Sequence, residues 1–138
     1  MERIAPANGG DPDVMAMHAF ALELTDATSL LWRMEMTGLE VPRDLSSDVA
    51  TASAPLCDEA LFPFVTVHQV YALARAQRDA EVHRLFAAAR NAAKSQPPDR
   101  QAVWRDVGFP VMTGAVAWAR DEMAAAVEAL HGVAHQIP

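Results

Sequence analysis

The sequence predicts an all-α fold built from antiparallel helical hairpins that pack on one another, as in helical-repeat proteins. Three observations predict it. Apolar residues recur at helical spacing through most of the chain, and residues that start or end helices separate these stretches. Alanine is abundant, whereas aromatic residues make up only 7% of the chain, which favours closely packed helices over sheets.

The first predicted element is one long helix. Residues 1–10 contain proline, asparagine and two glycines, so we expect a flexible lead before a single helical-repeat domain over residues 11–138. Asp11-Pro12 is a strong helix start, and Gly38 is a good terminator. One apolar stripe stays in phase across the polar run at residues 25–29, which predicts a continuous helix from Pro12 to Thr37. The stripe consists of Met17, Phe20, Leu24, Ala27, Leu31 and Met34.

The middle of the chain predicts a short helix and then a hairpin. Residues 39–63 contain three prolines. Between them we expect a short helix over Leu45–Ser53, capped by Ser46 or Ser47. Thr66 and Gln69 have the spacing of a capping box, which predicts a helix over Val67–Gln77. Asp79 caps the next predicted helix, whose apolar stripe consists of Val82, Leu85, Phe86, Ala89, Ala92 and Ala93.

The last third predicts a second hairpin. Residues 95–100 contain two adjacent prolines and form a linker, after which Asp99 caps a short helix that Gly108 ends. Pro110 starts the next helix, and Asp121 caps the final one. The apolar faces of these two helices are Val111, Met112, Ala115, Val116, Trp118 and Ala119, and then Met123, Ala126, Val127, Leu130, Val133 and Ala134.

Composition limits the possible partners and locations. The net charge of −7 argues against nucleic acid, because phosphate binding needs a cationic surface. No apolar run is long enough for a membrane span, and the start of the chain lacks the apolar run of a signal peptide. The single cysteine, Cys57, excludes an internal disulfide and fits a reducing, cytoplasmic location.

Several motifs resemble the tetratricopeptide repeat protein 38 family in their order and spacing. They are Ser29-Leu30-Leu31-Trp32-Arg33-Met34 with Gly38, Phe64 with His68, and Arg105-Asp106-Val107-Gly108-Phe109-Pro110. The resemblance covers about residues 20–137. It implies an irregular tetratricopeptide-like α-solenoid without an assigned catalytic activity. In the generic repeat pattern, Gly114 and Ala126 take the small positions and Leu130 a large apolar one, whereas Asp121 stands where glycine is usual.

The resemblance also predicts that apolar faces of the first and last helices lack the neighbouring repeats that cover them in the family. The family carries further repeats that this chain lacks, so the chain is expected to be a reduced relative or a fragment. Met15, Met17 and Leu22 at one end, and part of the final hairpin at the other, then have no family-type neighbours. We therefore expect a homodimer, or a complex with a partner that supplies the missing helices.

Five polar or aromatic residues in these motifs or directly beside them are candidate binding residues: Arg33, His68, Trp104, Arg105 and Asp106. Arg33 could clamp an anion in a groove, but an internal pair with helix ends or with Asp106 is favoured. His68 could act as a base or ligand, but a structural hydrogen bond is favoured because no catalytic partner is evident. We expect Arg33, His68 and Asp106 to lie close together.

No catalytic, cofactor or metal site is predicted. Glu128 and His131 form one Glu-x-x-His pair, with His135 one turn later, but a di-iron bundle needs two such pairs and further glutamates. Acidic neighbours are expected to raise the pKa of Cys57.

Three functions remain open. The leading one is an interaction or scaffold module that binds a protein or peptide in a groove between hairpins, with no evident catalysis. The alternative is a small-molecule-binding protein or enzyme subunit with a pocket around Arg33, His68, Trp104 and Asp106. The third is a structural domain that associates with itself.

Overall fold

The computed structural model describes residues 11–136, so the predicted flexible lead over residues 1–10 lies outside the described residues. Seven α-helices span α1 Pro12–Met36, α2 Arg43–Ser53, α3 Pro63–Arg75, α4 Asp79–Lys94, α5 Pro98–Val103, α6 Phe109–Ala119 and α7 Met123–Ala134. A short 3₁₀ turn, η1, covers Ala54–Leu56, and a π turn, η2, covers Trp104–Gly108. These residues contain no strand, so the predicted all-α fold is confirmed.

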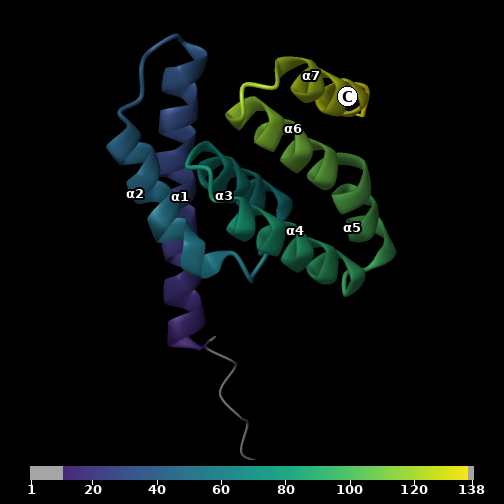
Figure 1. The fold of residues 1–138 in the computed structure, drawn as a ribbon. Helices are drawn as coiled ribbons and strands as arrows, with labels where there is room; N and C mark the ends of the chain where they lie inside the picture. Colours follow the sequence, from purple (N-terminus) through teal and green to yellow (C-terminus); the bar gives the residue numbers. More distant parts are fainter. Residues whose placement is uncertain (1–10, 137–138) are drawn as a thin grey trace, which may run out of the picture.

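The helices form three successive antiparallel hairpins, α1–α2, α3–α4 and α6–α7, and α5 leads into α6 (Figure 1). Helix α3 lies at the centre, because it packs against α1, α2, α4 and α6. Nine of its side chains are buried, and the main hydrophobic cluster joins it to α4, η2 and α6. The central hairpin therefore holds the other two together.

Helix α1 is continuous, as predicted, and Asp11 caps it by accepting a hydrogen bond from the Asp13 N–H at 3.0 Å. The buried face differs from the predicted stripe, of which only Leu24 is buried. The buried side of α1 instead includes part of the polar run, because Thr25 and Thr28 are buried along with Ala21. Both hydroxyls donate to carbonyls four residues earlier, at 2.8 and 2.7 Å, which lets threonine pack in an apolar interface.

Two predicted caps in the middle of the chain are wrong. Helix α3 begins at Pro63, so Thr66 and Gln69 lie inside it, buried, rather than at its start. Proline at the first helical position, not a capping box, fixes this start. Helix α2 begins at Arg43, and no side chain caps it, so neither Ser46 nor Ser47 has the predicted role.

Three acidic caps are also wrong. Asp79 is the first residue of α4, and its carboxylate accepts a hydrogen bond from Arg120 at 2.8 Å instead. Glu122, not Asp121, precedes α7, and Pro97, not Asp99, precedes α5. None of these helix starts has a side-chain cap. The acidic residues in the first turns of α4 and α5 complement the helix dipole only through their charge.

The predicted break at Gly108 is a π turn within a continuous helical segment over residues 98–119. Pro110 explains it, since proline lacks an N–H and its ring would collide with the carbonyl four residues earlier in a regular helix. Gly108 lets the turn close, because a Cβ there would lie 2.9 Å from Cε3 of Trp104.

The first helices of the three hairpins all end in one kind of turn, in which one residue has a left-handed backbone conformation. Gly38, Gln77 and Asp121 have positive φ angles of 81°, 59° and 60°. After each of them, an N–H bonds back across the helix end, from Leu39 to Met34, Arg78 to Leu73 and Glu122 to Ala117, at 2.9–3.0 Å. These are Schellman motifs, which prefer glycine at the left-handed position.

The last hairpin has the close approach that the repeat pattern predicts. A Cβ added at Gly114 of α6 would lie 2.7 Å from Cγ of Leu130 on α7. Ala126 is buried beside them, although Leu130 itself stays 38% exposed. In the described part of the chain, no helix combines the length and the apolar character needed to cross a membrane.

Candidate functional site

Of the five predicted site residues, only Arg105 and Asp106 are joined by hydrogen bonds within residues 11–136. Arg33 is exposed on α1, and no hydrogen bond or ion pair of its side chain occurs among residues 11–136. Arg105 and Asp106 pair with each other, with Nε and Nη2 of Arg105 donating to the two carboxylate oxygens at 2.7 and 2.9 Å. This pairing lowers the pKa of Asp106 and takes the place of the predicted bond from Arg33.

Trp104 is a core residue. It is 4% exposed, packs against Phe109 with ring centroids 5.5 Å apart, and belongs to the main hydrophobic cluster. Its indole therefore supports the π turn.

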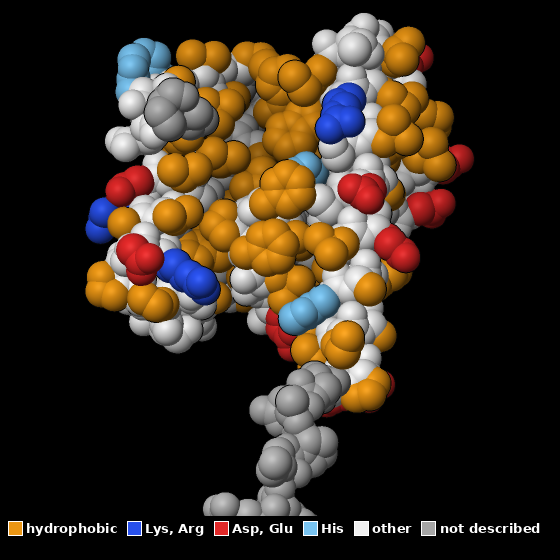
Figure 2. All heavy atoms as spheres, turned by 180° about the vertical axis from the view of Figure 1, so that it is seen from behind, with side chains coloured by type: hydrophobic (Ala, Val, Ile, Leu, Met, Phe, Trp, Pro, Cys, Tyr) orange, Lys and Arg blue, Asp and Glu red, His pale blue; other side chains and the backbone are white. Residues whose placement is uncertain are grey.

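His68 belongs to an aromatic surface formed by Trp32 of α1 with Phe64 and His68 of α3. The His68 ring lies 4.8 Å from the Phe64 ring and 6.1 Å from Trp32, in an edge-on arrangement. Phe64 is 61% exposed, and the other two side chains are half-buried. Figure 2 shows hydrophobic side chains gathered over the middle of the face seen from behind.

The hydrogen bond of His68 determines which of its two ring nitrogens is left to bind another group. Nδ1 lies 2.6 Å from the carbonyl oxygen of Phe64, and a carbonyl can only accept. Nδ1 therefore carries the proton, and Nε2 of the neutral ring remains as an acceptor. The aromatic surface thus offers one polar group on an otherwise apolar area.

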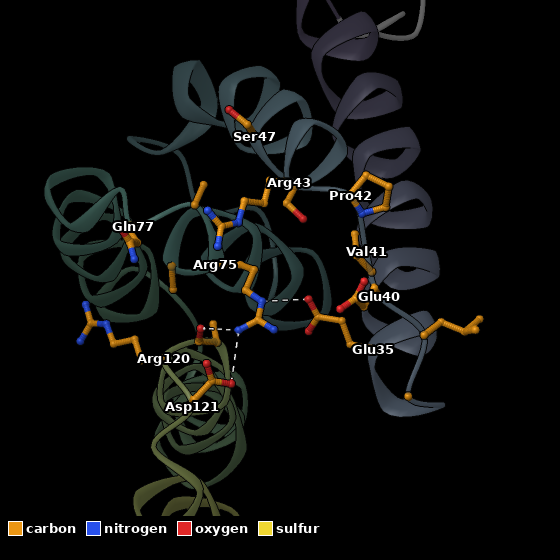
Figure 3. Close-up of a pocket in the computed structure, with 16 residues that line it drawn as sticks. Glu35, Glu40, Val41, Pro42, Arg43, Ser47, Arg75, Gln77, Arg120 and Asp121 are labelled. Atoms are coloured by element: carbon orange, nitrogen blue, oxygen red, sulfur yellow. Dashed lines mark hydrogen bonds and ion pairs between the residues drawn. The ribbon is translucent and has the colours of Figure 1, made fainter.

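A second site, not predicted from the sequence, is a polar groove of about 1180 Å³ at the carboxyl ends of α1, α3 and α6 (Figure 3). The start of α2 and the loop before it complete its wall. Three arginines (Arg43, Arg75 and Arg120) and three acids (Glu35, Glu40 and Asp121) line it, so its charges balance.

Arg75 lies at the centre of this groove and links all three hairpins. Its Nε donates to Oε1 of Glu35 at 2.8 Å, and its Nη1 donates to the carbonyl oxygen of Ala119 at 2.9 Å. Asp121 adds a longer ion pair at 3.5 Å. A guanidinium suits this place because its positive charge offsets the partial negative charge at the helix ends. Its N–H groups can also donate to carbonyls that lack a partner within their helix.

Tyr71 completes the network one turn earlier on α3. Its hydroxyl donates to Oε2 of Glu35, and its ring stacks on Trp32 at 4.3 Å with an interplanar angle of 3°. Both carboxylate oxygens of Glu35 are therefore occupied, by Tyr71 and by Arg75. The network connects the groove to the aromatic surface and fixes α1 against α3.

The other candidate groups bring no catalytic arrangement together. Cys57 is buried, and burial is the main cause of its raised pKa, with Asp58 and Glu81 adding to it. The exposed side chains of His131 and His135 on α7 meet edge to face, with ring centroids 4.9 Å apart. Within residues 11–136, no group of three or more His, Cys, Asp or Glu side chains is placed to hold a metal ion.

Comparisons with known proteins find no family model, curated protein or solved structure that matches the chain. The resemblance to the tetratricopeptide repeat protein 38 family therefore stays a prediction.

Proposed function

We propose that the protein is a helical-hairpin interaction module that binds an apolar segment of another polypeptide on the aromatic surface of Trp32, Phe64 and His68. The observation that carries this proposal is the exposure of Phe64, whose side chain is 61% accessible beside two other aromatic rings. Aromatic side chains that stay uncovered beside a rigid scaffold are common centres of protein interfaces.

The surroundings of the surface favour binding over catalysis. His68 uses Nδ1 within its own helix, so Nε2 can accept one hydrogen bond from a bound segment. Trp32 is held from behind by Tyr71, which Glu35 fixes in turn. A preorganised surface of this kind loses little entropy on binding.

The alternative of a small-molecule pocket around Arg33, His68, Trp104 and Asp106 has less support. The polar groove is lined by residues other than these four, and so is a small pocket beside Tyr71 and Arg75. The proposal keeps the cytoplasmic location and the scaffold role that the sequence predicts.

A peptide-display selection tests the proposed surface. Peptides from a random library are selected on the wild-type protein and then measured against Phe64→Ala. We expect the selected peptides to carry aromatic or aliphatic anchors. They should bind Phe64→Ala at least about tenfold more weakly than the wild type, because truncating an aromatic residue at the centre of an interface costs about 1.4 kcal/mol or more. Leu45→Ala is the matched control, since Leu45 is 46% exposed on α2. Selected peptides that bind Phe64→Ala as tightly as the wild type would refute the proposal.

A further inference from the structure

No helix within residues 11–136 covers the first turns of α1. Helix α1 spans 25 residues and α2 only 11, so α1 continues well beyond its antiparallel neighbour (Figure 1). We call residues 11–20 the arm. All of their side chains are exposed except Met17, which is half-buried.

The arm continues the apolar stripe that is buried further along α1. Val14, Met17, Ala21, Leu24, Thr28 and Leu31 alternate at spacings of three and four residues, which is the a/d pattern of a coiled coil. Ala21, Leu24 and Thr28 are buried in the part of α1 that meets the body of the protein. Val14 is 42% and the adjacent Phe20 44% exposed, so the stripe runs on without a partner.

Charge limits what can cover this stripe. Asp11 and Asp13 flank it at the e and g positions, and Glu23 and Asp26 follow on the exposed side of α1. Residues 11–32 contain no Lys or Arg, and none of the four carboxylates forms an ion pair within residues 11–136. Charged residues at e and g positions select the partner helix through opposite charge.

A second copy of this chain fits the arm poorly. The other uncovered apolar helix is α7, where Val127 is 65% and Met123 43% exposed. Residues 121–136 also lack Lys and Arg, and they carry Asp121, Glu122 and Glu128. Pairing arm with arm, or arm with α7, therefore sets carboxylates against carboxylates, which is unfavourable.

We propose that the arm is the docking site for an amphipathic helix of a partner protein whose apolar stripe is flanked by Lys and Arg. The partner helix extends the helical layer along α1 and covers Val14, Met17 and Phe20. Its basic side chains meet the carboxylates of Asp11 and Asp13. Of the two expectations that the sequence raises, a homodimer and a partner that supplies a helix, the charges favour the second.

Two designed peptides test this proposal on the full chain. Both are helices of about three heptads with Leu at a and d, and they carry Lys or Glu at every e and g position. We expect the Lys helix to bind at least about tenfold more tightly than the Glu helix at low salt, with the difference shrinking at high salt. Fluorescence anisotropy of labelled peptides measures both affinities. Equal binding of the two helices, or no binding of the Lys helix, would overturn the proposal.

Variants locate the binding. The double variant Val14→Ser/Met17→Ser should abolish binding of the Lys helix, whereas Leu30→Ser should not, because Leu30 is 59% exposed on another face of α1. Asp13→Lys should reduce the preference for the Lys helix. Binding that survives the double variant but is lost in Phe64→Ala, or in Val127→Ser, would refute the arm as the site. Light scattering that shows a homodimer dissociated by the double variant would also overturn the proposal.

Discussion

Tyr71 joins two helices through its hydrogen bond to the carboxylate of Glu35, and this contact depends on pH. Burial and the bond to Glu35 raise the pKa of Tyr71 well above its ordinary value of about 10. The folded protein therefore holds the phenolic proton more tightly than the unfolded chain does. The resulting stability is complete below the unfolded pKa and is lost as the pH rises above it.

Tyr71→Phe tests this linkage. Above pH 10, the unfolding free energy of the wild type should fall more steeply than that of the variant, by up to about 1.4 kcal/mol per pH unit for one proton. Urea unfolding at pH 8, 10 and 11 measures the difference. The other titratable groups are the same in both proteins, so their contributions cancel in the comparison. Parallel losses in the two proteins would show that Tyr71 is not the titrating group.

Gln77 provides a second test, because it holds a left-handed backbone conformation with a φ of 59°. This conformation costs a residue with a Cβ about 1 kcal/mol, and glycine avoids the cost. Gln77→Gly should therefore raise the unfolding free energy by roughly 0.5–1 kcal/mol. Ala76→Gly is the control, since Ala76 has a φ of −86° and should lose stability instead. A loss in both variants would contradict the assigned role of the turn.

The close approach of α6 and α7 can be tested with a double-mutant cycle. Alanine is a better helix former than glycine by about 1 kcal/mol, but a Cβ at Gly114 collides with Leu130. Gly114→Ala should therefore destabilise the wild type by about 1–3 kcal/mol and be neutral or stabilising in a Leu130→Ala background. Thermal or urea unfolding of the four proteins measures the coupling. An identical effect in both backgrounds would exclude the contact.

The periodicity of apolar residues predicts which segments are helical, but local rules for caps mislead here. Thr66 and Gln69 match a capping box in sequence, yet Pro63 starts α3 earlier and leaves both inside the helix. The predicted buried face of α1 is also wrong, because the Thr25 and Thr28 hydroxyls donate to carbonyls of their own helix and both side chains pack as small apolar groups. Such burial of polar side chains has no signature in a hydrophobicity pattern.

The network around Arg75 could not be found from motifs, because its parts lie far apart in the sequence. Arg75 meets Glu35 and the carbonyl of Ala119, and no local spacing relates the three. Two weak signals exist. Tyr71 and Arg75 are one turn apart on the same helix, and Glu35 continues the a/d spacing of the α1 stripe. A charged residue in phase with an apolar stripe is a reason to look for a buried partner.

Across the whole molecule, basic and acidic residues are unevenly distributed. Within residues 11–136, every Lys and Arg lies between Arg33 and Arg120, and the helical ends on either side are acidic and apolar. The arginines of the middle tie hairpins together through pairs such as Arg75 with Glu35 and Arg120 with Asp79. The proposed basic partner helix would meet the acidic end of this distribution that α1 forms.

Hydrogen exchange should reveal this division along α1. Helical turns that pack on no other element are marginal in water, so the exposed arm is expected to open more readily than the later turns, which pack against α2 and α3. Amides of Met15–Phe20 should exchange much faster than those of Thr28–Met36 in the free protein. Adding the Lys-flanked helix should slow exchange in the arm and leave the later turns unchanged, and the Glu-flanked helix serves as the control. Uniform protection along α1 in a monomer would mean that the arm is already stable, and it would remove the physical reason for a docked helix.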